Sequence, residues 1–243
     1  MKTMIFAAML GMSTLAQPAM AETLKEVPAA LNPAKAYILI EYRLMANPMA
    51  DFPGSRKTMP LTTGLSFARY DPVLGDIRGL GKASGNPLPP KTAVTEYFRN
   101  REIVRGDGAR LLLLEIDPDI WVIQAWGTTS FSLGSYSFKA EPGTVTDLGV
   151  VEGASDWPEG EHAMTGGDMM KMALAGPFRK QPPVAPMRAS IRPRAAGDMA
   201  VPAALASAQV KPVEFTKGVT FGNYLGGLVN RIEGVNASAK RAQ

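Results

Sequence analysis

Hydrophobic and polar residues alternate in several short stretches of the first two thirds of the sequence. In YILIEYRL, residues 37–44, the side chains of Ile38, Ile40 and Tyr42 fall on one face of an extended chain. Alternation with period two, carried by β-branched and aromatic residues, predicts a strand. Turn residues separate this stretch from similar ones at 65–70, 110–116, 121–126, 131–138 and 144–151, whereas 94–104 fits either a strand or a short helix. The pattern predicts a mainly β fold, an antiparallel β-sandwich over residues 36–151.

Two of these segments also indicate how their strands are buried or connected. The middle of RLLLLEI, residues 110–116, is continuously apolar, which indicates a strand buried on both faces. The segment from Ser132 to Val151 alternates, passes through Pro142-Gly143 and alternates again. Pro followed by Gly suits a type II turn, so we expect a β-hairpin with Gly143 at positive φ.

The composition changes after Val151, where prolines interrupt every long element. We expect residues 152–212 to form a linker or arm rich in Pro, Met and basic residues. Between 176 and 197 there are five basic side chains and no acidic one: Arg179, Lys180, Arg188, Arg192 and Arg194. Such an arm either serves only as a solvated tether or lies along an anionic surface of the cell envelope.

The last segment, residues 213–243, carries an apolar stripe at helical spacing, made of Phe221, Tyr224, Leu225, Leu228, Val229 and Ile232. This spacing predicts a short terminal helix. Because Gly226 and Gly227 weaken the helix, we expect it to form only when it docks on a partner surface or on the sandwich itself.

The amino terminus has the features of an export signal. Lys2 precedes an apolar run from Met4 to Leu15, and Ala19-Met20-Ala21 matches a cleavage site. We therefore expect residues 1–21 to be a signal peptide, residues 22–35 to lead into the sandwich, and the mature protein to be periplasmic or secreted. No later run approaches the length of a transmembrane helix.

The amino-acid composition excludes several kinds of functional site. The 243 residues include no cysteine, which excludes disulfides, thiol catalysis and zinc–thiolate sites. The formal net charge of +4 is too small to indicate nucleic acid binding. The sequence has one histidine, His162, in a loop-like context, and no G-x-S-x-G motif, so a hydrolase is the weakest of the functions that we consider.

Two clusters remain as candidate binding sites. Thioethers and one imidazole suit Cu(I), and they occur together at His162, Met164, Met169, Met170 and Met172. The same methionines fit the edge of a hydrophobic core equally well. Among the aromatic residues, we expect Trp121 to lie in the core and Trp126 to be exposed on the opposite face. Trp126, Tyr136 and Trp157 are the candidates for stacking on a sugar or peptide.

The stretch LLLLEIDPDIWVIQAWGTTSFSLGSYSFKAEPGTVTDLGVV, residues 111–151, resembles the end of small exported bacterial β-domains of unknown function. The resemblance covers about residues 36–151 and implies an architecture similar to the transthyretin-like or carboxypeptidase-regulatory sandwich. Asp119 stands where that pattern often has Gly. The resemblance implies no catalytic residues.

Together these observations predict an exported, non-enzymatic protein that needs no cofactor and has a binding or structural role in the cell envelope. Its partner would be an envelope protein or an anionic envelope surface. A periplasmic copper-binding protein is the main alternative. The sequence leaves the oligomeric state open.

Overall fold

The computed structural model describes residues 22–78, 101–174 and 184–235, and its fold is mainly β. The described residues form two seven-stranded sheets. The first sheet consists of β1 (Glu22–Leu24), β2 (Ala36–Arg43), β5 (Val104–Gly106), β6 (Ala109–Ile116), β10 (Thr144–Ser155), β11 (Met187–Arg192) and β12 (Gln209–Pro212). The second consists of β3 (Leu65–Asp71), β4 (Asp76–Ile77), β7 (Asp119–Trp126), β8 (Thr129–Ser130), β9 (Ser135–Ala140), β13 (Thr216–Val219) and β14 (Leu228–Val229). The helical elements described are α1 (Gly166–Leu174) and a 3-10 turn, η2 (Ala203–Leu205).

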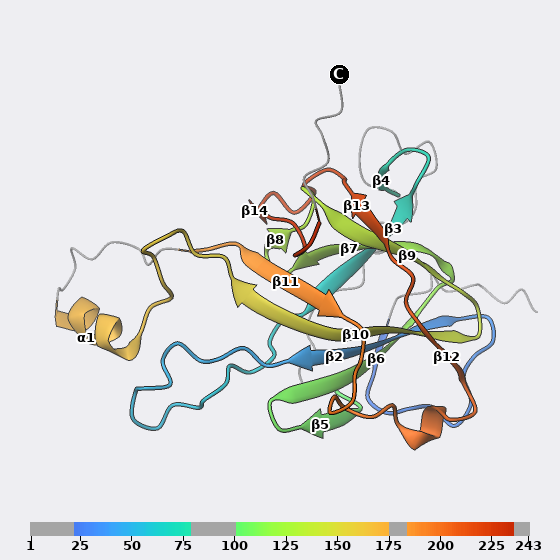
Figure 1. Cartoon of the computed structure of the whole chain (residues 1–243), viewed down its shortest axis with the longest axis horizontal. Coiled ribbons are helices and arrows are strands. Elements are labelled where there is room, and N and C mark those ends of the chain that lie inside the picture. The colour runs from blue at the N-terminus through green and yellow to red at the C-terminus, as the bar shows by residue number, and fades with distance from the viewer. Residues whose placement is uncertain (1–21, 79–100, 175–183, 236–243) are drawn as a thin grey trace, which may run out of the picture.

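The centre of the first sheet is the trio β6, β2 and β10. Short strands cover both of its edges: β5 and β1 pair in tandem with β6, and β12 and β11 pair in tandem with β10 (Figure 1). The edges of the sheet are therefore short strands, which offer little length for strands of other chains to add. The pairings of β10 with β2 and β12 are parallel, so this sheet is mixed, and the expectation of a wholly antiparallel sandwich is wrong in that respect.

The main core lies between the two sheets. It includes Ile38 and Ile40 of β2, Leu112 of β6, Phe67 of β3 and Ile123 of β7. The opposite face of the first sheet is also buried, because Tyr37, Leu39, Leu111 and Leu113 pack beneath Leu205 and its neighbours. Strand β6 is therefore covered on both faces, as its continuous apolar run predicts.

The predicted turn at Pro142-Gly143 is present, but the predicted hairpin is wrong. The Thr144 amide donates to the Glu141 carbonyl at 3.3 Å, and Gly143 has φ +68°. Strand β9 pairs with β7 and β13 in the second sheet, while β10 pairs with β2, β11 and β12 in the first. The turn is thus a corner between sheets. An alternating pattern identifies a strand but not the strand beside it.

The segment expected to be a free arm contains strands of the first sheet. Residues 187–192 form β11, which pairs antiparallel with the second half of β10, and residues 209–212 form β12. Arg179 and Lys180 lie outside the described residues. Prolines flank these short strands, and Pro212 ends one of them. Proline at the edge and end of a strand is compatible with a sheet, so proline content alone did not exclude one.

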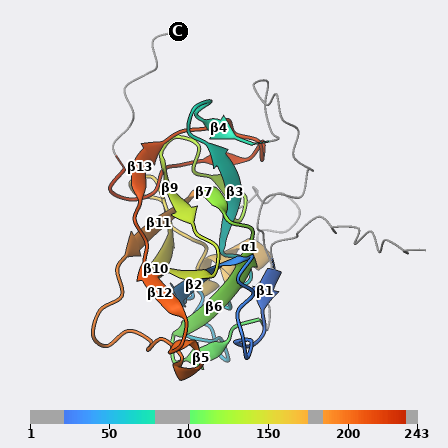
Figure 2. The ribbon, with the colours of Figure 1, turned by 90° about the vertical axis from the view of Figure 1, so that its right-hand side faces the viewer.

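The predicted terminal helix is also wrong. Residues 221–232 run as turns and extended chain, and β14 pairs parallel with β8. Gly226 has φ +64°, and a Cβ on Gly227 would lie 2.5 Å from the Thr128 carbonyl oxygen. The segment packs on its own sandwich: Ile232 is fully buried between the sheets, and Phe221 contributes to a cluster on the outer face of the second sheet. The two views agree on this path of the red segment (Figures 1 and 2).

An ion-pair cluster ties the carboxyl-terminal third to β2. The carboxylate of Glu41 is fully buried on the outer face of the first sheet, where Arg194 lies 2.6 Å and Arg43 2.9 Å from it. Arg194 also binds both oxygens of Asp147 on β10, each at 3.0 Å. The amide of Met199 donates to Glu41 at 2.9 Å. Arg194 was expected to be a free charge of a basic arm, and that expectation is wrong.

Asp198 extends the cluster. It accepts hydrogen bonds from Arg192 at 2.7 and 2.8 Å and from Arg43 at 2.7 Å. The hydrogen bonds from Arg192, together with those from the Ala195 amide and Arg43, hold the pKa of Asp198 well below its usual range. The carboxylate therefore stays charged at neutral and mildly acidic pH.

Substitution of Arg194 should be strongly destabilising. We expect Arg194→Met to lower the free energy of unfolding by about 3–5 kcal/mol, because it leaves the buried Glu41 carboxylate without its closest partner. Arg188→Met is the control, because Arg188 is an exposed residue of β11, the strand that ends just before Arg194. Urea denaturation of both variants measures the difference. Equal stability of the two would contradict the assigned role of Arg194.

A second prediction concerns the bulge in β10 between Asp147 and Val150. Gly149 has φ +81°, and a Cβ there would lie 2.1 Å from the Arg192 carbonyl oxygen. Gly108 has φ +66° with no atom near its Cβ position. Gly108→Ala should cost about 1–2 kcal/mol for the backbone conformation alone, and Gly149→Ala about 1–3 kcal/mol more for the overlap. Thermal melts that rank the two variants in the reverse order would be inconsistent with this packing.

Candidate functional site

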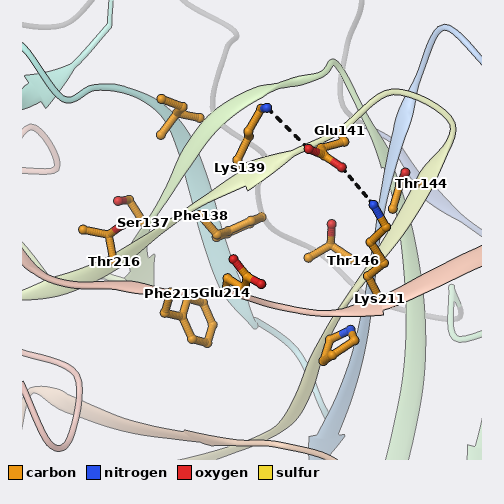
Figure 3. Close-up of a pocket in the computed structure, with 12 residues that line it drawn as sticks. Ser137, Phe138, Lys139, Glu141, Thr144, Thr146, Lys211, Glu214, Phe215 and Thr216 are labelled. Carbon is orange, nitrogen blue, oxygen red and sulfur yellow. Dashed lines mark hydrogen bonds and ion pairs between the residues drawn. The ribbon is translucent and has the colours of Figure 1, made fainter.

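A cleft of about 660 Å³ lies between the two sheets. Its walls are β9, the start of β10 and the chain from Lys211 to Thr216, which crosses from β12 in the first sheet to β13 in the second (Figure 3). We call this space the inter-sheet cleft. It exists because β9 and β10 diverge after the corner at Pro142-Gly143 and the crossing chain bridges them.

The rim of the inter-sheet cleft is charged but balanced. Glu141 lies between two ammonium groups, 3.1 Å from Lys211 and 3.3 Å from Lys139 (Figure 3). Hydrogen bonds from Lys211 and Lys139 lower the pKa of Glu141. Glu214 adds a further carboxylate to the lining. Two cations and two anions leave no excess charge, so the cleft does not favour a strongly charged ligand.

The interior of the inter-sheet cleft combines hydroxyl groups with apolar side chains. Ile120, Phe138 and Phe215 supply the apolar part, and the hydroxyls belong to Ser137, Thr144, Thr146 and Thr216. Thr144 bonds to Gln209 at 3.3 Å. Among the described residues, the other three hydroxyls have no hydrogen-bond partner. These groups can donate to or accept from a bound molecule.

One backbone edge also faces this cleft. The pairing of β13 with β9 ends at Ser137, opposite Thr216, whereas the pairing of β9 with β7 continues to Ala140. No described strand pairs with that side of β9 from Phe138 to Ala140. Lys139 lies in the middle of this short open edge, and a lysine there discourages the addition of a foreign strand.

A second cavity, of about 340 Å³, lies at the end of the sandwich where β2, β7 and β10 end and β11 begins. Its lining includes Leu44, Leu61, Trp126 and three methionines, Met45, Met59 and Met187. We call it the methionine pocket. Thr62, Thr63, Thr128 and Ser155 supply its hydroxyl groups.

The aromatic candidates do not form one exposed face. Trp126 is only 4% exposed and packs edge-on against Tyr42 at 5.6 Å, so its predicted exposure is wrong. Gly153 leaves room for its ring, because a Cβ there would lie 2.8 Å from the indole. Tyr136 is 5% exposed and donates its hydroxyl to the Glu233 carbonyl at 3.0 Å. Trp157 is partly buried in the chain after β10.

The residues of the predicted copper cluster lie on α1 or in the loop just before it, and α1 lies beyond one end of the sandwich (Figure 1). Thr165 and Asp168 cap this helix through reciprocal hydrogen bonds. Met169, Met170 and Met172 lie on α1, and Met164 precedes it. The exposed His162 ring lies 2.8 Å from the Ala163 carbonyl and 3.9 Å from Asp168. Within the described residues, no group of three or more His, Asp or Glu side chains is arranged to hold a metal, and a thioether site here stays a prediction.

Neither the inter-sheet cleft nor the methionine pocket was predicted from the sequence. The inter-sheet cleft brings together Lys139 and Lys211, which are distant in the sequence, and only the path of the crossing chain joins them. Met45, Met59 and Met187 are single methionines in unrelated contexts. Their spacing in the sequence matches no metal-binding motif.

No protein-family model matches this chain, and no curated protein or solved structure is significantly similar to it. No helix in the described part of the chain is long and apolar enough to cross a membrane.

Proposed function

We propose that this protein is an exported, non-enzymatic binding protein of the bacterial cell envelope, and that it binds an envelope carbohydrate in the inter-sheet cleft. The lining of that cleft is the observation that carries the proposal. Unpaired hydroxyls beside apolar side chains match the alternating polar and apolar surfaces of a sugar ring. The balanced charge of the rim disfavours a polyanion as the principal ligand.

Export with cleavage after Ala21 is compatible with the described strands. Cleavage after Ala21 would leave Glu22 as the new amino terminus, and Glu22 is the first residue of β1. Removal of residues 1–21 would then take away no described strand. The mature protein would retain every strand that covers the edge of β6.

The ion pairs of Glu141 with Lys139 and Lys211 support a binding role for the cleft. The lining contains hydroxyls, two lysines and two glutamates, and the Glu141 carboxylate is held ionised between the lysines. A glycosidase needs a second carboxyl group that stays protonated to act as the acid. The lowered pKa of Glu141 is unsuited to that role.

The direct test is calorimetric titration of residues 22–243 with oligomers of N-acetylglucosamine and with soluble glycan strands from purified cell walls. We expect Thr146→Val and Thr216→Val each to weaken binding roughly two- to tenfold, the effect of one lost hydrogen bond. Thr62→Val is the matched control, because Thr62 lines the methionine pocket instead.

Three results would contradict the proposal. The first is no saturable binding of either glycan. The second is an equal effect of Thr62→Val and Thr146→Val. The third is cleavage of the glycan during the titration, which would show that the protein is an enzyme.

A further inference from the structure

We infer that the methionine pocket is a binding site for a soft monovalent metal ion, Cu(I), with Met45, Met59 and Met187 as its thioether ligands and Trp126 as an aromatic wall. This site is distinct from the cluster around His162 that the sequence suggested. It is also independent of the inter-sheet cleft and of the carbohydrate proposal.

The register of one short ribbon places two of the thioethers side by side. An isolated antiparallel bridge joins Ala46 and Thr58, so Met45 lies directly opposite Met59. The amide of Met59 donates to the Met45 carbonyl at 2.8 Å. Residues directly opposite in an antiparallel pair have their side chains on the same face, with Cβ atoms about 5 Å apart. Both residues line the methionine pocket.

The third thioether comes from a different part of the fold and is firmly held. Met187 is the first residue of β11, where it pairs with Ser155. Its amide donates to Thr129 at 2.9 Å, and its carbonyl accepts from Asn230 at 3.0 Å. The Ser155 hydroxyl lies 4.0 Å from the Met187 sulfur. Strands of both sheets thus fix this ligand, and preorganised ligands bind a metal with less loss of entropy.

The side chains that line the methionine pocket favour one kind of metal ion. The lining of the pocket contains thioethers, hydroxyls and one indole, and it has no carboxylate, imidazole or thiolate. Neutral sulfur ligands are chosen by Cu(I), whereas Zn²⁺, Mg²⁺ and Ca²⁺ need the donors that this lining lacks. Trp126 lines the same pocket as the three methionines, so its indole can report on a bound metal ion. Arg43, the cation in the lining, is ion-paired with Glu41 and Asp198.

The experiment is a titration of residues 22–243 with Ag(I), a stable substitute for Cu(I), monitored by tryptophan fluorescence and by calorimetry. We expect one equivalent to bind and to quench the fluorescence of Trp126. Trp126→Phe should remove most of this quenching. The double variant Met45→Leu/Met187→Leu should weaken binding at least tenfold, and its melting temperature checks that it folds, since Leu conserves the volume of Met.

Matched control variants distinguish this site from the cluster around His162. Met170→Leu and His162→Ala should leave the affinity unchanged, because Met170 is exposed on α1 and His162 is in the loop before it. Thioethers do not titrate, so the affinity should be the same at pH 5 and pH 7. A site that includes His162 would instead lose affinity in the His162→Ala variant.

Any of three outcomes would overturn the inference. They are the absence of saturable Ag(I) binding, unchanged affinity in the Met45→Leu/Met187→Leu variant, and loss of affinity in His162→Ala. The last of these would place the metal at the cluster around α1. Binding of an apolar dye without any binding of Ag(I) would identify the pocket as a site for organic molecules instead.

Discussion

The fully buried carboxylate of Glu41 imposes the strongest constraint on this structure. A charged group on the face of a central strand is tolerated only when a partner neutralises it and hydrogen bonds surround it. Arg194 supplies the closest charge, and Arg43 and the Met199 amide supply the remaining contacts. Because Arg194 is distant from Glu41 in the sequence, this requirement brings the carboxyl-terminal third of the chain onto the first sheet.

That segment completes both sheets. Strands β11 and β12 cover the edge of β10, and the chain then crosses to the second sheet, where β13 and β14 pair with β9 and β8. Phe215, on the crossing, packs against Tyr136 and Phe138, and Ile232 enters the core between the sheets. Without this segment, the edges of β9 and β10 would lack these partners.

Both cavities depend on the same segment. Lys211 and Thr216 form one wall of the inter-sheet cleft, and Met187 supplies a side of the methionine pocket. The first part of the sandwich provides only the opposite walls of each. Docking of the carboxyl-terminal third is therefore a condition for either proposed binding activity.

Local patterns predicted the strands well and their partners poorly. The alternation in β2 and the apolar run in β6 reflect burial of each strand's own faces, which a short window of sequence contains. The partners of β9 and β10 depend on contacts with β7 and β2, far away in the chain. The basic residues Arg192 and Arg194 suggested a free arm because the carboxylates that balance them include Glu41 and Asp147, outside the basic stretch.

The terminal stripe and Trp126 failed as predictions for a related reason. The apolar spacing from Phe221 to Ile232 fits a helix, but Gly226 at positive φ and the close approach of Gly227 to Thr128 require a turn. Burial of Trp126 depends on the space above Gly153, on a strand of the other sheet. The two glycines in the stripe indicate a weak helix, but the approach to Thr128 and the position of Gly153 beside Trp126 are set by residues distant in the sequence.

Native-state hydrogen exchange tests the central claim, that the carboxyl-terminal third is an integral part of the sandwich. The β11 amides that bond to β10, and the Ile232 amide, which donates to the Gly134 carbonyl at 3.0 Å, should exchange only through global unfolding, as slowly as those of β2 and β6. Exchange of β11 and Ile232 at rates typical of an unfolded chain, with β2 and β6 still protected, would contradict the account.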